Sequence, residues 1–171
     1  IGIVGDGTGN PEKSPDAQML FNFLDQSPIN VGLYLSGDDI SSEFKSLASP
    51  AILNLETYIP HNLTTSDHVA AGHSVAPLVI KTGTAFINYA PDTCVAYGGC
   101  AGINDFDVLD PTGTSAMDAY YDPTPGNGAI IHNVSTNAQA KTARVVLSGI
   151  SFHDMRDDRP TFPYDRLAHL V

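Results

Sequence analysis

The sequence predicts an α/β fold in which helices pack on a mainly parallel β-sheet. An apolar, strand-like segment at 1–5 comes before a helix-like segment that starts near Ser14. A second strand-like segment follows at 30–37, and a second helix-like segment begins at Ile40. The order strand, helix, strand, helix favours parallel pairing, because parallel neighbours need a long crossover connection.

Each predicted helix carries apolar residues at a spacing that buries one of its faces. Ser14 is expected to cap the first helix, with Pro15 at its first helical position. The pair Asp38-Asp39 is expected to cap the second helix. The expected buried faces are Ala17, Leu20, Phe21 and Leu24 in the first helix, and Ile40, Phe44 and Leu47 in the second.

The middle of the chain, from about 49 to 125, is rich in Pro, Gly, Thr and Asn. It predicts an irregular, β-rich insertion that elaborates the ligand-binding edge of the sheet. The short apolar runs expected to give it strands lie at 51–55, 78–80, 85–89, 94–97 and 106–109. Beyond it, two strand-like runs at 128–134 and 144–148 predict an antiparallel hairpin at the edge of the sheet. A terminal helix is predicted at 163–170.

Length and composition indicate one globular domain over residues 1–171. The chain begins without Met, directly in a strand-like segment, so we expect a fragment or mature part of a longer protein. Nineteen acidic against eight basic residues give a net charge of −11, which disfavours nucleic acid as a partner. No apolar run is long enough to predict a membrane span. An unknown protein or small molecule is the expected partner.

Cys94 and Cys100 lie six residues apart around a glycine-containing loop. This spacing favours a small-loop disulfide, whereas a zinc site would need histidine ligands from elsewhere. Two glycosylation motifs, beginning at Asn62 and Asn133, are compatible with secretion. Together these features favour secretion or exposure at the cell surface.

The most informative polar segment ends the predicted strand at 144–148. It runs Gly149-Ile150-Ser151-Phe152-His153-Asp154 and places an imidazole and a carboxylate beyond the strand. Ligands and catalytic groups gather at strand ends in α/β sheets. At the end of the earlier strand at 30–37, Ser36 stands in a comparable position.

The segment Leu35-Ser36-Gly37-Asp38-Asp39, together with the late strand ending in Phe152-His153-Asp154, resembles the class I glutamine amidotransferase-like superfamily. The resemblance implies a three-layer flavodoxin-like fold, a nucleophile elbow after a central strand and a catalytic His at His153. The chain departs from the family pattern because no Cys occupies the elbow and Asp154-Met155 replaces Pro-Glu. The resemblance therefore implies a divergent, extracellular-type member rather than a thiol-dependent amidotransferase.

Two functions follow from these features. The first is a non-catalytic secreted or surface module that binds an unknown ligand. The alternative is a serine-dependent hydrolase of an amide or ester, with Ser36 as nucleophile and His153 as general base. Asp154 would orient the imidazole, a role open also to Asp157 or Asp158. Asp38, Asp39 and Arg156 are the expected ligand-binding residues.

Three further patterns have weaker functional interpretations. Gly72-His73-Ser74-Val75-Ala76 resembles a lipase elbow but lacks the strand before it and the helix after it. His61, His68 and His73 are close enough in sequence to converge on a metal, with independent surface or loop histidines as the alternative. No organic cofactor is expected. A structural Ca²⁺ is predicted at the 6–10 loop or at Asp105 and Asp107, with ordinary Asp-rich turns as the alternative.

Overall fold

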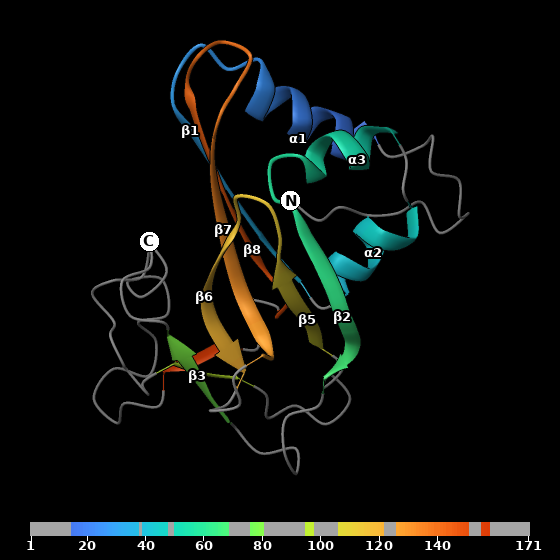
Figure 1. Ribbon diagram of the computed structural model, residues 1–171, viewed down its shortest axis with the longest axis vertical. Helices are drawn as coiled ribbons and strands as arrows, with labels where there is room; N and C mark the ends of the chain where they lie inside the picture. The colour runs from blue at the N-terminus through green and yellow to red at the C-terminus, as the bar shows by residue number, and fades with distance from the viewer. Residues whose placement is uncertain are drawn as a thin grey trace.

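The computed structural model describes residues 15–37, 39–47, 50–68, 76–80, 95–97, 106–121, 126–150 and 155–157. Within these ranges the chain forms a mixed α/β structure in which helices pack against one open sheet (Figure 1). The helices are α1 (Pro15–Asp25), α2 (Ile40–Leu47) and α3 (Pro50–Glu56). The strands are β1 (Val31–Ser36), β2 (His61–His68), β3 (Ala76–Ile80), β4 (Val95–Tyr97), β5 (Phe106–Pro111), β6 (Ala116–Tyr121), β7 (Gly128–Thr136), β8 (Thr142–Ser148) and β9 (Met155–Asp157).

The sheet is mixed, and the prediction of a mainly parallel sheet is wrong. Its main path runs β1-β8-β7-β6-β3-β4-β9, while β5 pairs with both β7 and β2. Only β1 and β8 pair in parallel among the described strands; their neighbours pair antiparallel. The reason lies in the connections. One long crossover joins β1 to β8, and the chain between them contributes strands that run back and forth.

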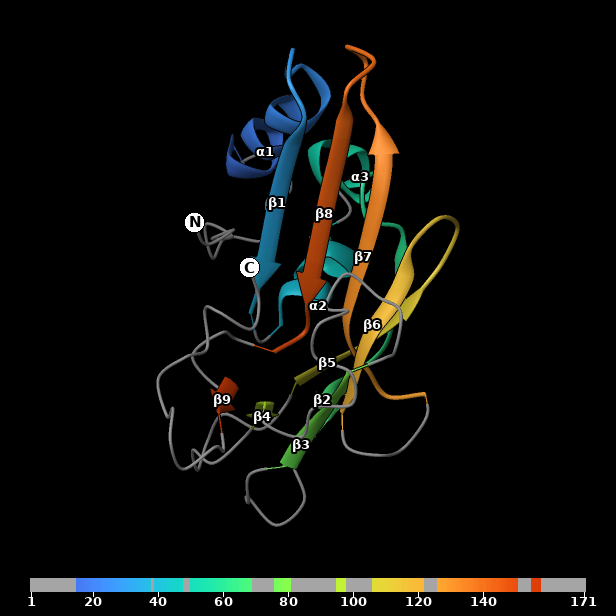
Figure 2. The same cartoon turned by 90° about the vertical axis from the view of Figure 1, so that its left-hand side faces the viewer.

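The predicted hairpin is confirmed, but its place in the sheet is not the edge. β7 and β8 pair antiparallel over seven residue pairs, from Ile130 with Ser148 to Thr136 with Thr142. β8 also pairs in parallel with β1, so the hairpin lies inside the sheet (Figure 2). Among the described strands β1 is one of the edges of the sheet. Its burial alternates along the strand, which contradicts the expectation of a buried strand at 30–37.

The first two helices begin where the sequence predicts them. On α1 the side chains of Ala17, Leu20 and Leu24 are buried, and on α2 Phe44 is buried. Asp39 precedes α2 with a positive φ of 62°, and its carbonyl oxygen accepts the Glu43 amide hydrogen. This bond closes the first turn of α2.

The apolar run at 51–55, predicted as part of the β-rich insertion, is helical instead. It forms α3, with Pro50 at the first position and Ile52 and Leu55 buried on one face. Proline is favoured at a first helical position, and a spacing of three is helical rather than extended. The runs at 78–80, 94–97 and 106–109 fall on β3, β4 and β5 as expected, with Cys94 just outside. The predicted elements at 1–5, 85–89 and 163–170 lie outside the described residues.

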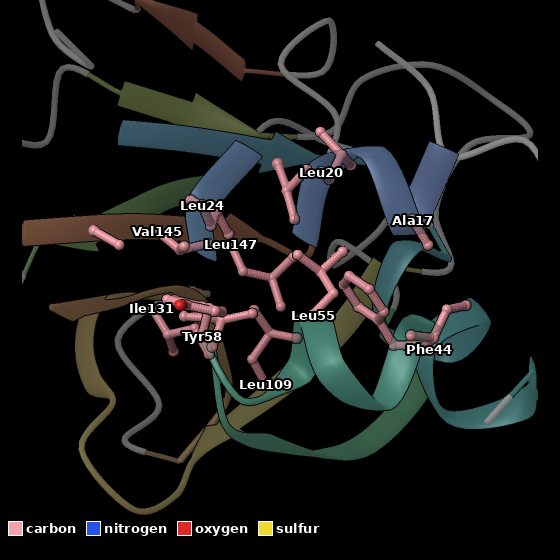
Figure 3. Close-up of a cluster of buried hydrophobic side chains, with 14 of the residues drawn as sticks. Ala17, Leu20, Leu24, Phe44, Leu55, Tyr58, Leu109, Ile131, Val145 and Leu147 are labelled. Atoms are coloured by element: carbon pink, nitrogen blue, oxygen red, sulfur yellow. The ribbon is translucent and has the colours of Figure 1, made fainter. Parts of the chain in front are cut away.

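The hydrophobic core lies between the three helices and one face of β1, β8 and β7 (Figure 3). The helices contribute Leu24, Phe44 and Leu55, and the sheet contributes Ile131 and Leu147. All three helices lie on the same side of these strands (Figure 2). Because side chains alternate along a strand, the residues between the core positions point to the opposite face.

Candidate functional site

The carboxyl ends of β1 and β8 lie side by side, as expected for parallel strands. Ser36, the last residue of β1, is in register with Ser148, the last residue of β8. The amide of Gly37 donates to the Ser148 carbonyl oxygen at 3.3 Å, so the two ends stay paired. Ser36 therefore occupies a strand-end position of the kind that carries ligands. His153 and Asp154 follow β8 in sequence and lie outside the described residues.

The described side chains that share hydrogen bonds near Ser36 carry hydroxyl groups. Leu33 and Leu35 pack toward the core. Because side chains alternate along a strand, Tyr34 and Ser36 both point to the opposite face of the sheet. Burial raises the pKa of the Tyr34 phenol, and hydrogen bonding with Ser148 and Ser36 opposes this effect. The Ser148 hydroxyl donates to the Ile150 carbonyl oxygen at 2.9 Å. Such a cluster can hold a polar group, but it supplies no base of its own.

A second serine does contact a histidine, at a place that the sequence does not predict. Ser41 Oγ lies 2.9 Å from Nε2 of His61, and Nδ1 of His61 lies 2.7 Å from the Ile59 carbonyl oxygen. A carbonyl can only accept, so Nδ1 carries the proton and Nε2 accepts from the serine hydroxyl. The Ser–His arrangement thus has the bond pattern of an activated nucleophile.

This Ser41–His61 pair is closed to substrate. Ser41 is 0% exposed and His61 is 2% exposed. Burial lowers the pKa of His61, the largest of several effects that include the nearby charges of Lys45 and Glu56. Lys45 itself contacts Glu56 and the His61 carbonyl oxygen. The pair is therefore part of the packing between α2 and β2.

Asp107 holds the start of α2 from a distant strand. Its Oδ2 accepts the amide hydrogens of Ser41 at 2.5 Å and Ser42 at 3.4 Å. The side chain is fully buried on β5. A carboxylate satisfies two backbone donors that have no partner within the helix, and it complements the positive end of the helix dipole. Its predicted partner in calcium binding, Asp105, lies outside the described residues, so that prediction stays open.

The predicted histidine trio does not come together in the part that is described. His61 and His68 stand at opposite ends of β2, seven residues apart. Extended chain covers about 23 Å over that interval. His61 is buried beside Phe44, whereas the His68 ring stacks on Tyr121 at 4.6 Å. His61 and His68 are thus independent of each other, as the alternative interpretation expects, but both lie in a strand rather than a loop and His61 is buried; His73 is not described.

Strands β6 and β7 are joined by a histidine–carboxylate hydrogen bond that the sequence alone does not predict. Asp118 is fully buried, and its Oδ1 accepts from Nδ1 of His132 at 2.8 Å. The His132 side chain remains 24% exposed. The available signal was a polar residue within each of two strand-like segments, Asp118 in Ala116–Tyr121 and His132 in Gly128–Thr136. Only strand pairing shows that the two residues meet.

An apolar groove lies between α1 and the edge strand β1. Its volume is about 390 Å³, and we call it the α1–β1 groove. Two helix residues beside it are strongly exposed for their type, Met19 at 68% and Phe23 at 48%. Ile29, just before β1, is also exposed. The residues that line the groove are Asp16, Met19, Leu20, Phe23, Gly32 and Leu33.

The remaining predicted site residues are placed only in part. Asp39 lies at the start of α2, where its Oδ1 accepts from the Ser42 hydroxyl at 3.2 Å. Asp38, Cys94 and Cys100 lie outside the described residues. The backbone of Arg156 is in β9, paired with Ala96 of β4.

The described ranges hold no group of three or more His, Cys, Asp or Glu side chains arranged for a metal ion. In the same ranges, none of the helices is both long enough and apolar enough to cross a bilayer.

Comparison with known proteins finds no matching family model, no matching curated protein and no matching solved structure. The class that can be stated is therefore structural: a mixed α/β protein with an open mixed sheet. The resemblance to the amidotransferase-like superfamily stays a prediction.

Proposed function

We propose that this protein is a non-catalytic interaction module that binds a protein partner through the α1–β1 groove. The observation that carries the proposal is the gathering of exposed apolar side chains there. Met19 and Phe23 are two of the six exposed large hydrophobic residues among those described, and both line the groove. Contiguous exposed apolar surface on a folded protein marks an interaction site more often than scattered residues do.

The closed Ser41–His61 pair supports the same proposal. A catalytic serine must reach a substrate carbonyl, and this one is fully buried with its hydroxyl engaged. On the opposite face, the hydroxyls of Tyr34, Ser36 and Ser148 lie together without a described histidine among their partners. The exposed large side chains of the α1–β1 groove, Met19 and Phe23, are apolar rather than nucleophilic.

Selection of short peptides from a random display library against the full chain tests the proposal. We expect selected peptides to lose at least tenfold in affinity for Phe23→Lys, because a charge would replace an apolar contact in the groove. Leu53→Lys is the matched control, since Leu53 is a similarly exposed apolar residue on α3, outside the groove lining. Peptides that bind both variants equally well would contradict the proposal, as would a failure to select any peptide.

We also propose that the module works outside the cell. The support is the Cys94/Cys100 spacing and the exposed position of Asn62 on β2. The second motif does not add support, because Asn133 is 1% exposed and its amide donates to the Tyr58 carbonyl oxygen at 2.9 Å. Expression in a secretory host should give a glycan at Asn62, none at Asn133, and a Cys94–Cys100 disulfide in peptide mass spectra. Free thiols in the secreted protein would contradict the proposal.

A second candidate is the serine hydrolase, favoured by the position of Ser36 at paired strand ends. In this proposal Ser36 is the nucleophile and His153 the general base, within the three-layer flavodoxin-like fold that the amidotransferase-like resemblance implies. A fluorophosphonate probe tests it directly. Labelling of the wild type that disappears in Ser36→Ala, but not in Ser41→Ala, would establish the hydrolase. Absence of labelling would contradict the hydrolase proposal.

A further inference from the structure

A second candidate site lies on the face of the sheet opposite the helices. The core residues of β1, β8 and β7 point toward the helices, so their neighbours in each strand point to the other face. In Figure 2 the three strands stand in front of the helices, and this face is toward the viewer. Strand pairing arranges its residues in rows. One row holds Tyr34, Val146 and His132, and the next holds Gly32, Arg144 and Val134.

Gly32 leaves a hollow in the second row. A Cβ built at this glycine meets no atom within 4 Å, so the position over the strand is open. Glycine inside a strand weakens it and often marks a place where a ligand approaches closely. Arg144 is the partner of Gly32 on β8, and Tyr34 is its next neighbour on the same face of β1. A ligand group over Gly32 is therefore beside both a guanidinium and an aromatic ring.

The Tyr34 ring is fixed at both ends and is still exposed. Its phenol shares hydrogen bonds with Ser148 and Ser36, which form the next row along the strands. Because the ring is held at its Cβ and at its hydroxyl, it lies along the sheet. The residue is nevertheless 39% exposed. The negative face of an aromatic ring attracts the weakly positive C–H groups of a ligand ring that stacks on it.

Arg144 is an exposed cation, and the residues that flank it across the strands, Gly32 and Val134, are uncharged. Neighbouring strands lie about 4.8 Å apart and two residues rise about 6.7 Å, so the Cα atom of Arg144 is about 8 Å from those of Tyr34 and His132. Long side chains reach across such diagonals. A guanidinium binds a carboxylate through two parallel hydrogen bonds.

His132 lies at the other end of the first row, with its tautomer fixed. The register of β6 shifts between Met117 and Ala119, which makes Asp118 the extra residue of a β-bulge. The buried Asp118 carboxylate accepts from Nδ1 of His132 at 2.8 Å, so the neutral ring presents Nε2 as a hydrogen-bond acceptor. The His132 side chain is 24% exposed. Bulges that re-aim a side chain are frequent next to functional sites.

The three side chains together specify the chemistry of a ligand. The guanidinium takes a carboxylate, the flat phenol ring takes the C–H face of a ring, and the imidazole Nε2 accepts from a hydroxyl. A uronic acid in a glycan supplies all three groups. From Tyr34 to His132 the row spans two strand spacings, about 10 Å, which accommodates two linked sugar rings. The net charge of −11 repels polyanions and so favours a ligand with a single carboxylate.

We propose that the face of the sheet opposite the helices binds a glycan through Gly32, Tyr34, Arg144 and His132, and that the bound unit is a uronic acid linked to a neutral sugar. The carboxylate binds Arg144 over Gly32, and the uronic acid ring stacks on Tyr34. A hydroxyl of the neutral sugar donates to Nε2 of His132. The site lies on the opposite side of β1 from the α1–β1 groove and does not depend on the proposed function.

The test uses the full chain and the disaccharide of glucuronic acid and xylose. Saturation-transfer NMR detects binding, and titration of the amide signals gives the affinity. We expect the C–H protons of the uronic acid ring to receive the most saturation, because they lie against Tyr34. The methyl ester of the disaccharide should bind about tenfold more weakly, because it lacks the charge that pairs with Arg144. Equal binding of the ester, or equally tight binding of benzoate, would overturn the proposal.

Protein variants locate the site. Arg144→Gln should weaken binding of the disaccharide about tenfold, and His132→Gln about two- to tenfold. Lys141→Gln is the matched control for Arg144, because it removes one positive charge from an exposed position just before β8 and should leave the affinity unchanged. Gly32→Val should abolish binding by filling the hollow. An unfolding curve for each variant verifies that the fold is kept.

Two further outcomes decide against the proposal. If the Arg144 and Lys141 variants weaken binding equally, the disaccharide responds to charge in general and the site is overturned. If the disaccharide does not bind the wild type, the site is overturned as well. Neither result bears on the proposed function, because selection of peptides at the α1–β1 groove is tested through Phe23.

Discussion

At the scale of single residues, buried polar side chains join elements that are far apart in the sequence. Ser41 binds His61, Asp107 binds the amides at the start of α2, and Asn137 donates to the carbonyl oxygens of Leu24 and Ser27. Each bond satisfies a group that would otherwise lose its hydrogen bond on burial, at a cost of about 1–3 kcal/mol. These contacts specify how the helices sit on the sheet.

The buried imidazole of His61 makes stability depend on pH. Burial lowers the pKa of His61 in the folded chain, so below about pH 6.5 the unfolded chain binds a proton that the folded chain resists. The contribution of neutral His61 to the free energy of unfolding is fully present above that pH and is lost as the pH falls. Between about pH 7.5 and about pH 5.5, the free energy of unfolding should fall by about 1 kcal/mol less in His61→Gln than in the wild type.

Urea unfolding at the two pH values measures this difference. His132→Gln is the control, because it also removes one imidazole but from the opposite face of the sheet, where His132 pairs with Asp118. An unchanged pH dependence in His61→Gln would show that His61 does not resist protonation in the folded protein.

The Asp107 carboxylate should matter far more than a surface carboxylate on the same strand. Asp107→Ala leaves the amides of Ser41 and Ser42 without their acceptor, and we expect a loss of about 1–3 kcal/mol in unfolding free energy. Asp110→Ala is the matched control, because Asp110 is exposed on β5 and should change stability by less than about 0.5 kcal/mol. Equal losses in chemical denaturation would contradict the capping role.

At the scale of elements, close backbone contacts decide where strands meet. The amide of Asp107 donates to the Gly149 carbonyl oxygen at 3.1 Å, and the Gly149 amide donates to Ala129 at 2.9 Å. Gly149 thus joins β5 and β7 just beyond the end of β8. A side chain there would collide with the carbonyl oxygen of Asp107. The glycine in the Gly149–Asp154 segment therefore serves packing of the sheet.

Two glycine substitutions should behave in opposite ways. Gly149→Ala should destabilise by about 1–3 kcal/mol or more, because the backbone of Asp107 or Gly149 must move. Gly32→Ala meets open space and should be neutral or stabilising by up to about 1 kcal/mol. Thermal unfolding of the two variants measures the contrast, and a similar melting temperature for both would contradict this packing.

At the scale of the whole molecule, the described sheet contains strands that are paired on both sides and strands that are paired on one side. β8 is hydrogen-bonded on both sides, by β1 and by β7, whereas β1 has one described neighbour. The helices cover one face of these three strands (Figure 2), and the α1–β1 groove lies beside β1. The strand with pairing on both sides, β8, is thus distinct from β1, which lies beside the groove that is proposed to bind a partner.

Hydrogen exchange should differ between the amides of β8 and those of β1. The amides of β8 should exchange slowest, because their opening requires disruption of pairing on both sides. In β1 every second amide faces the edge, and those amides should exchange much faster than their neighbours. Uniform protection along β1 in the isolated full chain would contradict an open edge.

Local patterns were sufficient to predict the helices α1 and α2, the hairpin β7–β8 and the position of Ser36 at a strand end. These features depend on capping residues, apolar spacing and turn connections, which act over a few residues. The run at 51–55 was assigned wrongly because five apolar or small residues fit a helix or a strand equally well without their packing partners.

The sequence by itself thus determined the α/β class, the acidic character and the apolar faces of the first two helices. Only the tertiary structure decided that the sheet is mixed, that β1 is an edge among the described strands, and that Ser41, His61 and Asp107 meet in the interior. The physical reason is the sequence separation over which each kind of interaction acts. Local patterns set each element, but strand order and buried polar contacts join residues up to 113 positions apart, and many alternative pairings satisfy the same local pattern.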